Sequence, residues 1–258
     1  MTSTPPSTHL APTRLRFSDI GFAIATGLSL LHTLPRVSVA YAAVFATLGL
    51  ALLTVLGMVG LSPMALPFAG GFMLVGPILL AGYFELVRLH ESGIQPTIGD
   101  PFRAFARAPA GLWLLAVLCA FLFVIWITDA GILYSFTIGE TDLGYDLAWL
   151  PQQGRDVLTF ELWGALMGSV LAYLIFTVSA FSVPLVYEGR AGLVQGISAS
   201  ARVVLGNFLV CLAWGITLGS VIVLSILVMP VLLFTLPVMS YASFALYRRA
   251  FPDRQETP

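Results

Sequence analysis

The stretch LWLLAVLCAFLFVIWITDAGIL, residues 112–133, decides the class of this protein. It carries a single charged side chain, Asp129, near its carboxyl end. A helix of roughly 20 apolar residues crosses the hydrocarbon core of a bilayer, which is about 30 Å thick. The stretch therefore predicts a membrane-spanning helix, and the rest of the chain must be read as part of a membrane protein.

Comparable apolar runs lie on both sides of this stretch. They cover residues 39–61, 66–87, 162–186 and 208–247. The last run is about twice the length of one span, and Pro230 near its middle favours a helix boundary. We therefore divide it into the spans 208–228 and 230–247. The sequence predicts an all-α polytopic transmembrane bundle of six spans.

The composition supports a membrane domain over most of the chain. Of the 258 residues, 58% are hydrophobic and 10% are charged, values far outside those of soluble proteins. We expect one transmembrane domain over residues 18–251, between a disordered N-terminal tail, residues 1–17, and a C-terminal tail, residues 252–258. The net charge of -1 and the dispersed basic residues give no electrostatic footprint for nucleic acid, so the lipid bilayer is the expected partner.

Arginines set the expected orientation, because cytoplasmic loops are enriched in basic side chains. The basic residues other than histidine are all arginines, and all but one precede the first span, lie between spans two and three or four and five, or follow the sixth. The exception is Arg155, which lies in the acidic loop 134–160. This distribution predicts that both termini are cytoplasmic.

A unit of one short amphipathic helix, a proline or glycine break and two spans occurs three times. The short helices are predicted within residues 18–35, 100–109 and 192–206. The six spans would then form three hairpins, each preceded by a short amphipathic helix on the cytoplasmic surface. In the third short helix Ser200 intrudes on the apolar side, and in the second Asp100 is placed to cap the helix start.

The first short helix, residues 20–34, admits two interpretations. An apolar arc faces a polar arc on the helical wheel, which favours a helix lying on the membrane. The apolar arc consists of Ile20, Ile24, Leu28, Leu31 and Leu34. Phe22 and Leu30 interrupt the polar arc, so a short seventh span or a signal anchor is the alternative.

Ionisable residues within spans are the first candidates for functional side chains. Glu85 precedes Arg88 by three residues on one helix face, so the two side chains can pair at the cytoplasmic surface. In a second interpretation Glu85, Tyr83 and Arg88 form the polar lining of a cytoplasmic vestibule. Asp129 lies near a span end, where anchoring at the membrane interface is the expected role.

Prolines and glycines mark further candidate positions in the spans. Pro77, Pro184 and Pro237 are expected to kink helices for packing. Pro77 and Pro237 each stand eleven residues before an arginine, Arg88 and Arg248 respectively.

Glycine pairs at four-residue spacing are expected to let helices of the chain approach one another closely. The pairs are Gly164 with Gly168 and Gly215 with Gly219.

No constellation in the sequence carries a named chemistry. No span pairs His, Cys, Asp or Glu at positions that would converge on a metal ion. Serines within the spans have no histidine or lysine beside them to act as a base. We therefore expect no metal, no cofactor and no catalytic residue, and a protein that is not an enzyme.

Three sequence blocks occur together in this chain. They are GFMLVGPILLAGYFELVRLHESG (71–93), SVPLVYEGRAGLVQGISASARVVLGN (182–207) and LPVMSYASFALYRR (236–249). In this combination residues 36–251 resemble the bacterial integral membrane proteins of domain of unknown function 2189. The resemblance implies a polytopic inner-membrane protein of bacteria, with no catalytic or cofactor-binding residue to carry over.

Some similar proteins carry a label as cytochrome c oxidase subunit I, which the histidines here exclude for this chain. Haem and copper centres of that enzyme need several intramembrane histidines, whereas His9, His32 and His90 all lie outside the predicted spans.

The expected function is that of a non-enzymatic accessory, assembly or interaction subunit, with another membrane protein or complex as a possible partner. A small-molecule or lipid transporter is the alternative. The threefold repeat and the prolines favour it, and the nearly charge-free span interiors disfavour it.

Overall fold

The computed structural model describes residues 12–70, 79–138 and 155–252, and every regular element within these ranges is a helix. The elements are α1 (Phe17–Thr33), α2 (Pro35–Met58), the 3-10 helix η1 (Ser62–Met64), α4 (Ala81–Glu91), α5 (Asp100–Ala106), α6 (Ala110–Thr137), α7 (Arg155–Ser179), α8 (Ser182–Tyr187), α9 (Leu193–Gly206), α10 (Phe208–Leu227) and α11 (Met229–Ala250). The predicted all-α class is confirmed.

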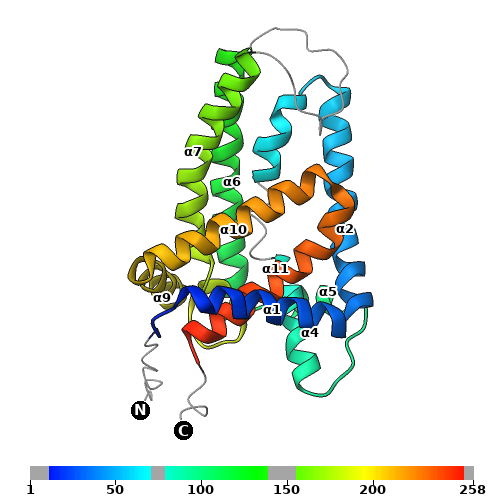
Figure 1. Cartoon of the computed structure of the whole chain (residues 1–258), viewed down its shortest axis with the longest axis vertical. Helices are drawn as coiled ribbons and strands as arrows, with labels where there is room; N and C mark the ends of the chain where they lie inside the picture. The colour runs from blue at the N-terminus through cyan, green and yellow to red at the C-terminus, as the bar shows by residue number, and fades with distance from the viewer. Residues whose placement is uncertain (1–11, 71–78, 139–154, 253–258) are drawn as a thin grey trace.

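Helices α2, α6 and α7 run along the long axis of the molecule, whereas α1 lies across that axis near the end where both termini are found (Figure 1). Helices α10 and α11 are inclined between these two directions. Prolines in the first turn, where the missing N–H costs nothing, mark the starts of several helices. They are Pro35 of α2, Pro101 of α5 and Pro230 of α11.

Within the described residues, five helices are long and apolar enough to cross a membrane. They are Pro35–Met58, Ala110–Thr137, Val157–Tyr187, Phe208–Ile226 and Met229–Ala250. The remaining predicted span, residues 66–87, includes residues 71–78, which lie outside the described ranges. On either side of them the chain is helical at residues 65–70 and again in α4. The count of six spans and their grouping into three hairpins stay predictions.

Helix α1 packs along α11, and a glycine allows the close crossing. Ala23 and Gly27 of α1 are buried. A Cβ atom added at Gly27 would lie 2.4 Å from the carbonyl oxygen of Val238, so only glycine fits there. In the predicted apolar arc, Ile20, Ile24 and Leu31 pack against the core, whereas Leu28 is 46% exposed. Helix α11 thus covers much of the apolar face of α1, which the sequence pattern predicts to contact lipid.

The break between α7 and α8 has a specific cause. Pro184 cannot donate a helical hydrogen bond, and three residues earlier the hydroxyl of Ser200, from α9, enters the helix ladder. Its Oγ accepts from the backbone N–H of Phe181 at 3.2 Å and donates to the carbonyl oxygen of Thr177 at 2.8 Å. The serine therefore satisfies both backbone groups of a broken i to i−4 pair. Its place on the apolar side of α9 is explained by this role.

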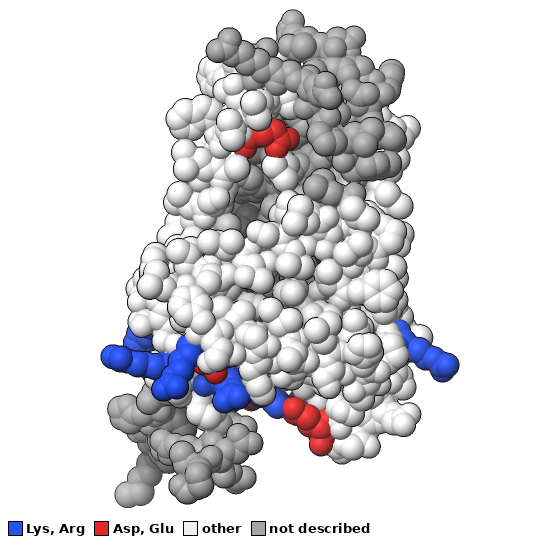
Figure 2. Space-filling view, in the orientation of Figure 1, with Lys and Arg blue, Asp and Glu red and all other residues white. Residues whose placement is uncertain are grey.

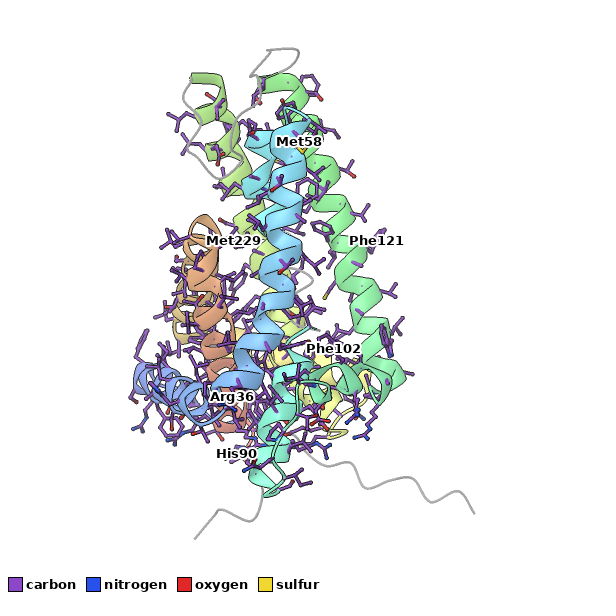
Figure 3. The ribbon with its side chains drawn as sticks, turned by 90° about the vertical axis from the view of Figure 1, so that its right-hand side faces the viewer. Arg36, Met58, His90, Phe102, Phe121 and Met229 are labelled. Atoms are coloured by element: carbon purple, nitrogen blue, oxygen red, sulfur yellow. The ribbon has the colours of Figure 1, made fainter. Side chains whose placement is uncertain are left out.

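The hairpin of α10 and α11 reaches only part of the way along α2. Its tip, Met229, lies about halfway between Arg36 and Met58, near the two ends of α2 (Figure 3). A Cβ atom at Gly49, in the middle of α2, would lie 3.1 Å from the Met229 Cε. Helix α11 continues through Pro237, with the Ser240 hydroxyl donating to the carbonyl oxygen of Leu236 at 2.6 Å.

Candidate functional site

Charged side chains collect at the end of the molecule that carries the termini. Figure 2 shows the arginines as a belt near that end and an uncharged surface above it, with a separate acidic group toward the other end. The belt lies at the level of α1, α9 and the ends of α4 and α11 (Figure 1). The candidate site is the set of ionisable groups within this belt.

The first centre of the site is the carboxylate of Glu85 on α4. Its side chain is only 4% exposed. Arg88, one turn later, donates two hydrogen bonds to it, from Nε at 2.8 Å and from Nη2 at 2.6 Å. The Tyr187 hydroxyl donates a third at 2.6 Å, and Arg107 lies 3.9 Å away. The predicted pair of Glu85 and Arg88 is present, and both carboxylate oxygens are occupied.

The second centre is the carboxylate of Glu188, which directly follows α8. The Tyr247 hydroxyl donates to it at 2.6 Å, and Arg248 and Arg190 approach it at 3.4 Å and 3.7 Å. Arg248 also pairs with Glu91 at the end of α4, and Arg190 donates to the carbonyl oxygen of Phe251 at 2.9 Å. This centre therefore joins α4, α8 and α11.

Adjacent residues at the end of α8 connect the two centres. Tyr187 donates to the carboxylate of α4, whereas Glu188 accepts from the tyrosine of α11. We name the whole set the Tyr-Glu network: Glu85, Arg88, Glu91, Arg107, Tyr187, Glu188, Arg190, Tyr247 and Arg248. A charged pair held by several hydrogen bonds costs more to break than an exposed pair, so the network fixes three helix ends against one another.

Sequence reasoning found Glu85, Arg88 and Arg248 but missed Tyr187, Glu188 and their partners on α11. A signal was present, since a tyrosine stands one to five residues before an arginine at the ends of α4, α8 and α11. Only the fold reveals that these ends meet.

Tyr83 belongs to an aromatic layer beneath the network. Its side chain is fully buried, and its hydroxyl donates to the Ser38 carbonyl oxygen at 3.4 Å. Its ring lies edge-on to Tyr41 and Tyr241, with centroids 4.9 Å and 5.4 Å away. Tyr241 also shares a 2.6 Å hydrogen bond with the Ser38 hydroxyl. The structure thus uses Tyr83 to join α2, α4 and α11, away from the carboxylate of Glu85.

The other predicted positions are spread over the fold. Asp129 is partly buried on α6, and its carboxylate forms no ion pair within the described ranges. Pro184 and Pro237 are buried in α8 and α11. Pro77 lies outside the described residues. Of the three described positions only Pro184 contacts the Tyr-Glu network through a hydrogen bond, since its carbonyl oxygen accepts from the backbone N–H of Glu188 at 2.9 Å.

Asp100 shows how the loop before α5 is fixed. It is the first residue of the helix instead of its cap, which is Gly99. Its Oδ2 accepts hydrogen bonds from the backbone N–H of Thr97 at 2.7 Å and from the Thr97 hydroxyl at 2.8 Å. These bonds lower the pKa of the Asp100 carboxyl below its ordinary value. Asp100 therefore does not cap α5 as predicted, and instead stabilises the turn that precedes this helix.

The described residues contain no group of three His, Cys, Asp or Glu side chains placed to hold a metal ion. Both cysteines, Cys119 and Cys211, are buried on different helices. What the Tyr-Glu network can do chemically is to hold opposite charges in fixed positions.

Residues 65–188 match the model of a family described as predicted integral membrane protein, DUF2189. The expected resemblance to the DUF2189 family is confirmed over these residues. The matched segment carries both carboxylate centres of the network, Glu85 and Glu188, and ends before the partners on α11. It is shorter than the resemblance over residues 36–251. No curated protein and no solved structure matches the chain.

Proposed function

We propose that this protein is a non-enzymatic accessory or assembly subunit of the bacterial inner membrane, which presents its arginine-bearing end to another membrane protein. The observation that carries this proposal is a pair of apolar side chains on the loop between α4 and α5. Ile94 and Ile98 are 55% and 59% exposed, and the loop follows the charged end of α4. Apolar side chains beyond the charged belt favour a protein contact over a lipid contact.

The arginines beside this loop indicate the chemistry of the partner. Arg103 and Arg107 have side chains that are 66% and 70% exposed. Together with the two isoleucines they form a surface that suits a segment carrying apolar and acidic side chains.

The occupied state of Glu85 supports a role without catalysis. A general acid or base must reach a substrate, and the carboxylate of Glu85 is buried and held by three hydrogen bonds. We therefore assign the Tyr-Glu network to holding the helix ends that carry the partner surface.

The proposed topology places both termini and the short helices α1, α5 and α9 on the cytoplasmic side, with six spans in three hairpins. The arginine belt supports this orientation. A reporter fused at Tyr145 should be active outside the cytoplasm, and one fused at Pro258 inside it. The reverse pair of results would refute the orientation.

Photocrosslinking tests the partner surface. A photoreactive residue at Ile98 should give one discrete protein adduct in intact membranes, and the same residue at Val117, which is 63% exposed on the span α6, serves as the lipid-facing control. Charge reversal of Arg103, which lies outside the Tyr-Glu network, to glutamate should weaken the adduct without lowering the protein level. Lipid adducts alone at both positions would refute the proposed role.

A transporter of small molecules or lipids is the second candidate. A cavity of about 420 Å³, lined in part by residues of α6, α7 and α10, favours it. Uptake or lipid flipping by the purified protein in liposomes, absent from protein-free liposomes, would establish this function in place of the first.

A further inference from the structure

The cavity of about 420 Å³ lies away from the Tyr-Glu network. Its walls come from residues 66–70, α6, α7 and α10, and they include Trp126, Phe160, Glu161, Gly164, Gly168 and Ser220. Helix α7 starts at the end of the molecule opposite the termini, so Glu161 lies in that half (Figure 1). Figure 2 shows a hollow in this part of the surface, close to acidic side chains.

Small residues create the space, and a fixed tryptophan bounds it. Among the described residues, a Cβ atom at Gly164 would meet only the Leu133 Cδ2, at 4.0 Å, so this glycine leaves open space instead of allowing a close helix crossing. At Gly168 the same atom would lie 2.6 Å from the Trp126 ring. That ring is held by a 2.8 Å hydrogen bond from its Nε1 to the carbonyl oxygen of Pro67. One glycine of the predicted pair thus packs against a ring, and the other opens a cavity.

Among the described residues that line the cavity, Glu161 is the only one with an ionisable side chain. It is partly buried, and within the described ranges its carboxylate forms no hydrogen bond or ion pair. It stands four residues after Val157, where the candidate span begins, which is about 6 Å along the helix. An ionisable group inside a span is costly without a partner and marks a functional site by default.

We propose that this cavity binds an ammonium group that carries an apolar body, with Glu161 as its counter-ion. The charge of the carboxylate selects a cation. A metal ion would need several oxygen ligands, whereas the lining offers one carboxylate among mostly apolar walls. Trp126, Phe160 and Val223 suit a hydrocarbon body, and the cavity volume lies within the range of small-ligand sites.

The ammonium group can come from two sources, a lipid headgroup such as phosphatidylethanolamine or a free organic amine. Both share a positive nitrogen next to an apolar part. Binding of such a group at Glu161 requires neither the proposed partner surface nor transport.

Two measurements on the full-length protein test the site. In detergent, titration calorimetry with benzyltrimethylammonium chloride, against its neutral isostere neopentylbenzene, measures binding of a free cation. In nanodiscs with equal phosphatidylethanolamine and phosphatidylglycerol, native mass spectrometry of the released protein measures retained lipid. Glu161→Gln removes the charge at constant size. Asp129→Asn is the matched control, because Asp129 lies in the same helical pair but not among the cavity-lining residues.

Glu161→Gln should weaken binding of the cation, or retention of phosphatidylethanolamine, by about tenfold or more, whereas Asp129→Asn should leave both unchanged. Gly164→Leu fills the cavity without changing charge and should also reduce binding. Loss with the soluble cation identifies a free amine as a ligand, and loss confined to phosphatidylethanolamine identifies the lipid. The proposal is overturned if the wild type binds neither, if it binds the neutral isostere equally well, or if Glu161→Gln and Asp129→Asn behave alike.

Discussion

Substitution of Ser200 by alanine tests the most specific feature of the fold, the hydroxyl that enters the break between α7 and α8. Ser200 is fully buried. Its removal leaves the Phe181 N–H and the Thr177 carbonyl oxygen without their partner, and a buried group left unsatisfied costs about 1–3 kcal/mol. Partial closure of the direct bond between these two groups would recover some of that free energy. We expect Ser200→Ala to lower the free energy of unfolding by about 2 kcal/mol.

The buried cysteines provide the assay. Cys119 and Cys211 are each 1% exposed, so a thiol-reactive fluorogenic dye reports unfolding during heating in detergent. About 2 kcal/mol corresponds to a midpoint lower by about 4–8 °C for a chain of this size. Ser198→Ala, on the exposed side of the same helix α9, is the matched control and should change the midpoint little. Equal midpoints for the two variants would refute the role given to Ser200.

Three further substitutions test the helix contacts. Gly27→Ala should destabilise the packing of α1 on α11 and make α1 sensitive to protease, because its Cβ would lie 2.4 Å from a backbone oxygen. Gly21→Ala is the control and should have neither effect, because the space around Gly21 is open. Tyr247→Phe should lower the free energy of unfolding by about 1 kcal/mol, because Glu188 loses the hydrogen bond that the tyrosine donates at 2.6 Å. The thiol-reactivity assay measures this change, and an unchanged midpoint would contradict the stabilising role given to the Glu188 centre. The lowered pKa of Asp100 means that its contribution to stability is present above the ordinary carboxyl pKa and is lost as pH falls through the lowered value. Protection of the α5 loop amides against hydrogen exchange, relative to the intrinsic rate at each pH, should therefore fall in acid, and Asp100→Asn should abolish that pH dependence. An equal fall in the variant would argue against the role of Asp100.

Local chemistry accounts for what the sequence predicted correctly. The apolar stretch around Asp129 gives a helix, because a backbone in lipid must satisfy its own hydrogen bonds. Glu85 and Arg88 pair because residues three apart on a helix face the same side. Ser200 looked anomalous on the wheel of its own helix, since the backbone groups that it satisfies belong to another helix.

The sequence by itself determined that the chain is a helical membrane protein and that its arginines are concentrated in particular segments between the apolar runs. Both follow from composition and from periodicity within single segments. Only the tertiary structure decided that Tyr187 and Glu188 connect α4 with α11, and that Glu161 faces a cavity without a charged partner among the described residues. The physical reason is that these properties depend on which helix ends and faces meet, and hydrophobic patterning specifies that a face is covered but not by what.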